Sequence, residues 1–197
     1  MPQNNGVKEE VHEKGNLLWI LKNALVAVRK EDTVKLKDLS NRTVHSASIQ
    51  QDPDSVAVAV IVYSLSKIIE RQKYTSYKEW PKFYKNYLAS IRCAIKDLQS
   101  NEPEKFREDL RDIQGGINKL SGKFKKYIQD VFRKAEINKA SRVYEHGISM
   151  EKTAKLLGIT IWELAEYAGQ TGISDVNLTV TMPIKQRLKQ AEEIFNL

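Results

Sequence analysis

Helix-breaking and cross-linking residues are scarce in this chain: its 197 residues include one cysteine, five prolines and nine glycines. A single cysteine, Cys93, excludes an intramolecular disulfide. Together with the lack of a signal peptide at the start, it predicts a reducing, cytoplasmic setting. So few breakers leave long uninterrupted segments, which favours helices over short strands joined by turns.

Long hydrophobic runs are also missing. The longest uncharged stretch, residues 55–66, is shorter than the roughly 20 apolar residues that a membrane-spanning helix needs. We therefore expect no membrane segment. Val56 to Val62 are mostly β-branched, which is typical of a strand, but Asp52-Pro53-Asp54 is a good helix start. The run is predicted to be a helix in the centre of the core.

Apolar residues recur at three- and four-residue spacing along most of the chain, so the predicted fold class is all-α. Gly115-Gly116 is expected to end or kink one helix before a long basic helix over 117–145. The domains predicted are a mobile tail, a basic multi-helix domain, and a helix-turn-helix-like module with a short strand and a terminal helix. Their ranges are 1–13, 14–147 and 148–197.

The net charge of +7 is divided unevenly. Residues 1–147 hold 27 Lys/Arg and 19 Asp/Glu, whereas residues 148–197 hold 5 and 6. Any basic surface for an acidic partner therefore belongs to the part of the chain before the last fifty residues.

Two short helices joined by a tight turn are predicted over residues 148–168. Ser149 and Thr160 are placed to cap them, and Ala154 is small where the two helices would cross. Gly158 lies at the turn, and Ile159 and Leu164 are expected to pack inward. A small residue, a turn glycine and flanking apolar positions at these intervals are typical of a helix-turn-helix.

This stretch resembles the helix-turn-helix of small prokaryotic antitoxin-like proteins, over about thirty residues from Ala140 to Tyr167. The resemblance implies a DNA-binding partner of a toxin. The residues that carry it are Tyr144, Gly147, Ser149, Ala154, Leu157-Gly158-Ile159 and Trp162-Glu163-Leu164. Residues 1–139 resemble no family.

The second of these helices departs from what a DNA-reading helix needs. It contains Glu163 and Glu166 and no Lys or Arg, although neutralising phosphates supplies most non-specific DNA affinity. The alternative is a module that packs on the domain or docks on a protein. After it, Leu178, Val180 and Met182 alternate as in a short strand, which is predicted to pair in a homodimer, to pair with a protein partner, or to pack as an extended segment.

Two basic stretches are candidates for binding nucleic acid. In residues 67–96, lysines alternate with aromatic residues, a combination that binds RNA or single strands unless the aromatic rings face the core. In the long helix, lysines and an arginine share the face opposite the apolar seam. The site residues predicted are Lys73, Tyr74, Tyr77, Lys78, Lys82, Lys85, Lys119, Lys123, Lys126 and Arg133.

Catalytic chemistry finds little support in the sequence. No metal pattern links the three histidines, and there is no phosphate loop or nucleophile elbow, so no metal and no cofactor are expected. His45 shares a helical face with Asn41, Ser48 and Asp52, which leaves an enzyme centred on His45 as the weakest alternative.

The function expected is a non-enzymatic, cytoplasmic nucleic-acid-binding regulator of the antitoxin or transcription-regulator type, acting as a homodimer. The alternative is an RNA- or ribosome-associated factor whose C-terminal module docks on protein. DNA and RNA are not distinguished by the sequence.

Overall fold

The structure, a computed structural model, describes residues 11, 13–72 and 76–171, and within these ranges its regular secondary structure is helical throughout. The all-α prediction is therefore confirmed for this part of the chain. The helices are α1 (Lys14–Arg29), α2 (Thr33–Gln50), α3 (Pro53–Arg71), α4 (Trp80–Gln99), α5 (Pro103–Asn118), α6 (Gly122–Glu145), α7 (Met150–Leu157) and α8 (Ile161–Thr171). The predicted strand over 176–182 and the helix after Pro183 lie outside the described residues.

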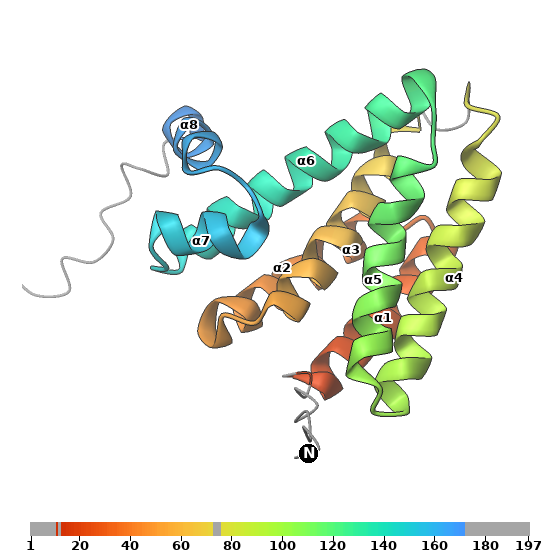
Figure 1. Cartoon of the computed structure of the whole chain (residues 1–197), viewed down its shortest axis with the longest axis horizontal. Coiled ribbons are helices and arrows are strands. Elements are labelled where there is room, and N and C mark those ends of the chain that lie inside the picture. The colour runs from red at the N-terminus through yellow and green to blue at the C-terminus, as the bar shows by residue number, and fades with distance from the viewer. Residues whose placement is uncertain (1–10, 12, 73–75, 172–197) are drawn as a thin grey trace, which may run out of the picture.

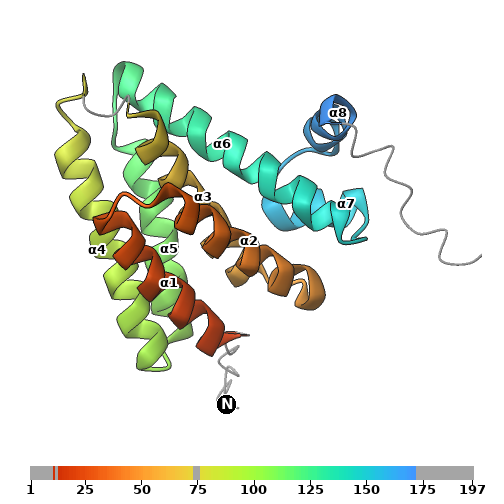
Figure 2. The same cartoon turned by 180° about the vertical axis from the view of Figure 1, so that it is seen from behind.

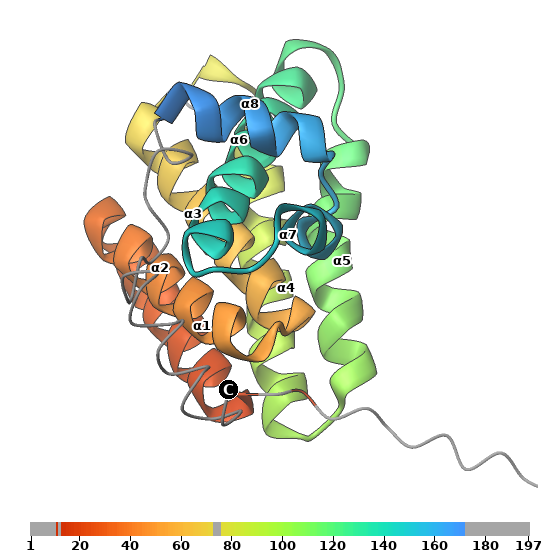
Figure 3. The same ribbon diagram turned by 90° about the vertical axis from the view of Figure 1, so that its left-hand side faces the viewer.

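A bundle of α1 to α5 forms the body of the molecule, and the long helix α6 lies across it (Figure 1). The helix α2 packs most extensively on α3, and α4 packs on α5. Seen from behind, α1 lies beside α4 (Figure 2). The last two helices, α7 and α8, are carried at the C-terminal half of α6, and α8 crosses α6 (Figure 3).

The helix α3 is central, as its apolar sequence predicts. Asp52 caps its first turn by accepting hydrogen bonds from the backbone N–H groups of Asp54 and Ser55 at 3.2 and 3.0 Å. This cap, with Pro53 at the first helical position, overrides the β-branched preference of the following run. Most of α3 is buried, and neighbouring helices also hydrogen-bond its backbone: Tyr87 donates from its hydroxyl to the Ile61 carbonyl at 2.8 Å.

The boundary between α5 and α6 corrects two predictions. The helix α5 continues through Gly115-Gly116 to Asn118, because Ile113 and Ile117 extend its buried seam beyond the glycines. The long helix begins only at Gly122, which has a φ of +55°, and not at Ile117. The expectation that Lys119 shares a face of the long helix with Lys123 is therefore wrong: Lys119 is the C-terminal cap of α5.

Candidate functional site

The α7–α8 unit, residues 149–171, has the local geometry that its sequence predicts. The Ser149 hydroxyl accepts from the Lys152 backbone N–H at 3.3 Å and caps α7. Gly158 ends α7 with a φ of +64°, a left-handed conformation that suits glycine. Ala154 of α7 is buried, and Leu164 on the inner face of α8 is fully buried. The predicted caps, turn and inward-facing residues of this unit are confirmed.

A capping box begins α8. The Thr160 hydroxyl accepts from the Glu163 backbone N–H at 3.2 Å, and the Glu163 carboxylate accepts in return from the Thr160 backbone N–H at 2.9 Å. The backbone N–H groups of Thr160 and Glu163 are thereby each hydrogen-bonded to the side chain of the other residue. Thr160 is confirmed as the cap, and the spacing of Thr160 and Glu163 in the sequence already carried the signal for this reciprocal pair.

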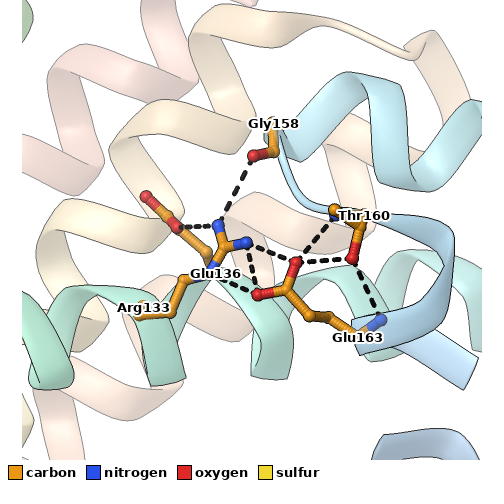
Figure 4. A network of polar contacts seen from close by, with 5 residues as sticks. All are labelled: Arg133, Glu136, Gly158, Thr160 and Glu163. Carbon is orange, nitrogen blue, oxygen red and sulfur yellow. Dashed lines mark hydrogen bonds and ion pairs between the residues drawn. The ribbon is translucent and has the colours of Figure 1, made fainter. Parts of the chain in front are cut away.

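The same carboxylate fixes α8 to α6 through Arg133 (Figure 4). The guanidinium donates to both Glu163 oxygens, with Nε 2.9 Å from Oε1, and also contacts Glu136 at 3.0 Å and the Gly158 carbonyl at 3.4 Å. We call Arg133, Glu136, Gly158, Thr160 and Glu163 the Arg133 clamp. Hydrogen bonds from Arg133 first, and from Thr160 second, lower the pKa of Glu163 to about 2.

The Arg133 clamp gives Arg133 and Glu163 different roles from those expected from the sequence. Arg133 was expected to face phosphates, but its guanidinium is occupied by two carboxylates and a carbonyl, because α8 packs over this part of α6. Glu163 was expected to make α8 acidic, but its charge is compensated by Arg133. The exposed part of α8 is therefore less acidic than its sequence suggests.

Two large apolar side chains stand at the start of α8. Trp162 is 83% exposed and Ile161 is 44% exposed. The helix Ile161–Thr171 contains no Lys or Arg. This surface offers apolar contact area and no cation for a phosphate.

The predicted basic residues converge elsewhere, at the end of the bundle where α4 and α6 begin and α5 ends (Figure 1). Six of the predicted lysines lie there. All six are exposed, and none lies within ion-pair distance of a carboxylate in the described part of the chain. We call them the basic end: Lys78, Lys82, Lys85, Lys119, Lys123 and Lys126. The sequence placed these lysines in two separate stretches, and the fold brings the stretches together.

A cavity of about 430 Å³ between α4 and α5 joins the two stretches directly. Lys82 and Lys119 both line it, and Glu79 and Asp112 line it as well. Lys82 and Lys119 therefore border one cavity, although they are 37 positions apart in the sequence.

The aromatic residues between these lysines are packed inside the protein. Tyr77 is half-buried, its ring centroid lies 4.8 Å from that of Phe124, and it stacks on Tyr127. Trp80 stacks on Tyr84, with 4.9 Å between the ring centroids. The prediction that Tyr77 stacks on bases is thus not supported by its placement, because its ring contacts the core. Lys73 and Tyr74 lie outside the described residues, as do Leu178, Val180 and Met182.

The polar face around His45 does not assemble the catalytic set imagined for it. Asp52 is buried and caps α3, and the Ser48 hydroxyl donates to the Val44 carbonyl at 2.8 Å. Neither side chain is directed at His45. Instead, His45 Nδ1 lies 3.3 Å from Nε2 of His146, at the end of α6, a contact that the sequence analysis missed.

About two turns before His146, Lys139 on α6 is buried at 1% exposure. Its ammonium donates to Asn41 Oδ1 at 2.9 Å and lies 4.0 Å from the centre of the Tyr63 ring. Burial first, and the nearby charges of Arg142 and Lys67 second, lower the pKa of Lys139 to about 7. Asn41, spaced four residues before His45, was the only sequence signal for this contact.

Other chemistry is not assembled in the residues that the structure describes. Within them, no three His, Cys, Asp or Glu side chains converge as a metal site would require. None of the described helices combines the length and apolar character needed to cross a membrane. Comparison with known protein families, with characterised proteins and with solved structures found no match to this chain.

Proposed function

We propose that this protein is a non-enzymatic nucleic-acid-binding regulator that holds the phosphate backbone at its basic end. The observation that carries the proposal is the convergence of six exposed lysines from α4, α5 and α6, without a described carboxylate partner for any of them. Lysines of this kind neutralise phosphates and release the counterions that surround a nucleic acid.

The packing of the aromatic residues favours double-stranded nucleic acid over single strands. Recognition of unpaired bases requires exposed aromatic faces. In the basic end the described aromatic residues are buried or half-buried against one another. Cations without stacking platforms favour contacts to the backbone of a duplex, either DNA or structured RNA.

The α7–α8 unit takes a separate role in this proposal. Because α8 has no Lys or Arg and exposes Ile161 and Trp162, it suits an apolar pocket on a protein better than a DNA groove. Such a division, with backbone binding by the bundle and protein docking by the C-terminal unit, is shared by an antitoxin-like regulator and by an RNA- or ribosome-associated factor. Homodimer formation through residues 176–182 remains part of the proposal.

A matched pair of double variants tests the basic end. Lys82→Gln/Lys119→Gln removes two charges from it, and Lys96→Gln/Lys105→Gln removes two exposed charges from the opposite ends of the same helices, α4 and α5. Binding to a DNA duplex and to an RNA hairpin is measured by fluorescence anisotropy at several salt concentrations. The first variant is expected to lower the slope of log K against log salt by about 2, because two phosphate contacts are lost.

The control variant is expected to bind as tightly as the parent, because its two charges lie away from the basic end. Its net charge equals that of the first variant, so a difference between the two variants reports the position of the charges. Equal weakening in both would show a general effect of net charge and would overturn the assignment of the basic end. A preference for the RNA hairpin with the same loss in the first variant would select the RNA-associated factor over the DNA regulator.

A further inference from the structure

A pair of histidines joins α2 to the end of α6. Nδ1 of His45 and Nε2 of His146 lie 3.3 Å apart, and both side chains are exposed to solvent. The ring planes are inclined by 59°, with centroids 5.4 Å apart, so the nitrogen atoms rather than the ring faces approach each other. Residues 101 positions apart in the sequence are thereby brought into contact.

The backbone of α6 sets the protonation of His146. Its Nδ1 lies 2.7 Å from the Arg142 carbonyl oxygen, which can only accept a hydrogen bond, so Nδ1 carries a proton. In the neutral ring Nε2 then has a lone pair directed at His45, and Nδ1 of His45 is the group within hydrogen-bond distance of it. An imidazole held by one nitrogen to a carbonyl, with the other nitrogen free, is the arrangement found in metal-binding histidines.

The spacing of the two nitrogens agrees with a shared metal ion. Zinc binds imidazole nitrogen at about 2.0–2.1 Å, and a tetrahedral angle then separates two ligand nitrogens by about 3.3–3.4 Å. The observed separation is 3.3 Å. His45 presents a lone pair at Nδ1 when its own proton is on Nε2, which is the other neutral tautomer and needs no change in charge.

Two arginines on the same helices have partners of their own. The Arg142 guanidinium is 2.9 Å from the Glu145 carboxylate, and the Arg42 guanidinium lies 4.5 Å from the centre of the Trp19 ring. Each guanidinium therefore has a partner other than the histidine pair, although Arg42 and His45 line the same cavity.

We propose that His45 and His146 together bind one divalent transition-metal ion of the zinc and copper class. Imidazole suits these ions, and water would fill the remaining positions, because no third His, Cys, Asp or Glu joins the pair among the described residues. The ion would tie α2 to the turn that leads from α6 into α7, and so stabilise the base of the α7–α8 unit. This inference does not depend on the proposed function.

Isothermal titration with Zn²⁺ tests the site in the full-length chain. Cys93 is exposed and is a competing soft ligand, so all variants carry Cys93→Ser. Both His45→Asn and His146→Asn are expected to weaken Zn²⁺ binding by more than about tenfold, since the loss of even an outer hydrogen-bond partner typically costs about 10–100-fold. The third histidine provides the control, since His12→Asn should bind as the parent does.

Two further measurements keep the test decisive. Circular dichroism verifies that the Asn variants are folded, which is expected because both side chains are exposed. Added Zn²⁺ should raise the Tm of the parent and of His12→Asn, but not of the other two variants, since only binding to the folded state stabilises it. Absence of Zn²⁺ binding, binding unchanged in His45→Asn, or binding lost in His12→Asn would each overturn the proposal.

Discussion

The two halves of α6 carry similar basic side chains and use them differently. In the first half, Lys123 and Lys126 are exposed and have no described carboxylate partner. In the second half, taken as Arg133 to Glu145, Arg133 holds Glu163, Lys139 is buried against Tyr63, and Arg142 pairs with Glu145. The number of basic residues is thus a poor guide to the charge that a partner can reach.

The difference follows from what packs on each half. The second half of α6 contacts α2 and carries α7 and α8, so its long side chains meet other helices. The first half begins at the turn after α5 and projects beyond α8. Where another helix packs on α6, a basic side chain binds groups of the protein itself. Where no helix packs on it, the side chain can still reach an external phosphate.

The largest expected effect comes from Lys139→Met, which removes the buried ammonium. Replacing a buried charge with an apolar side chain of similar length should raise the free energy of unfolding at pH 7 by about 1–4 kcal/mol. The partner Asn41 is exposed, so water can satisfy its oxygen after the change. Chemical denaturation followed by circular dichroism measures the difference.

The pH dependence of stability distinguishes the buried Lys139 from the exposed Lys126. The pKa of Lys139 is about 7 in the folded protein and near 10.4 in an unfolded chain. Between these values the unfolded chain binds more protons, so this lysine makes stability rise with pH, and its full cost is present below about pH 7. Lys139→Met should flatten that rise, whereas Lys126→Met, on the exposed half, should not. An unchanged slope in Lys139→Met would contradict the burial of a charged amine.

A smaller effect is expected from Gly158→Ala at the turn of the α7–α8 unit. No atom lies within 4 Å of the position that the added Cβ would take, so the cost comes only from the φ of +64°. It should be about 1 kcal/mol. Gly115→Ala in the last turn of α5 also meets no atom within 4 Å, but there the backbone is helical, and alanine should stabilise the protein by about 0.5–1 kcal/mol. Thermal denaturation of both variants measures the opposite signs, and equal signs would contradict this account.

Local patterns in the sequence predicted most of the helices because their signals are short-range. Asp52-Pro53 and Ser149 identified helix starts, and Gly158 identified a turn. The break at Gly122 was missed, since the seam of α5 continues through Gly115-Gly116 and the start of α6 has no side-chain cap. At the end of α5, the burial of Ile117 extended the helix although Gly115-Gly116 predicted its end.

The sequence predicted which residues of the candidate site are basic, but not which of them a partner can reach. Lys82 and Lys119 were identified as basic, but only the fold shows that they line one cavity. Arg133 was identified with them and is instead bound to Glu163. A side chain's partner on another helix depends on how the helices cross, which a pattern within one helix does not encode.

The smallest expected effect is on the Arg133 clamp itself. Arg133→Lys keeps the charge, but a single ammonium cannot donate to Glu163, Glu136 and the Gly158 carbonyl together. The clamp is partly exposed, and partly exposed ion pairs contribute little, so the Tm should change only slightly. Hydrogen exchange should nevertheless become faster in α8, and not in α3.

The companion variant Glu163→Gln separates the two tasks of that carboxylate. Glutamine can preserve the capping box with Thr160 but loses the ion pair with Arg133, so faster exchange in both variants would assign the effect to the clamp. The low pKa of Glu163, about 2, means that its contribution is present above the ordinary carboxyl range near pH 4 and is lost as the pH falls toward 2. If exchange in α8 is unchanged in both variants, the burial of Leu164 and Ala168 and the neutral hydrogen bond from Asn138 to Tyr167 hold the helix, and the ion pair does not position α8.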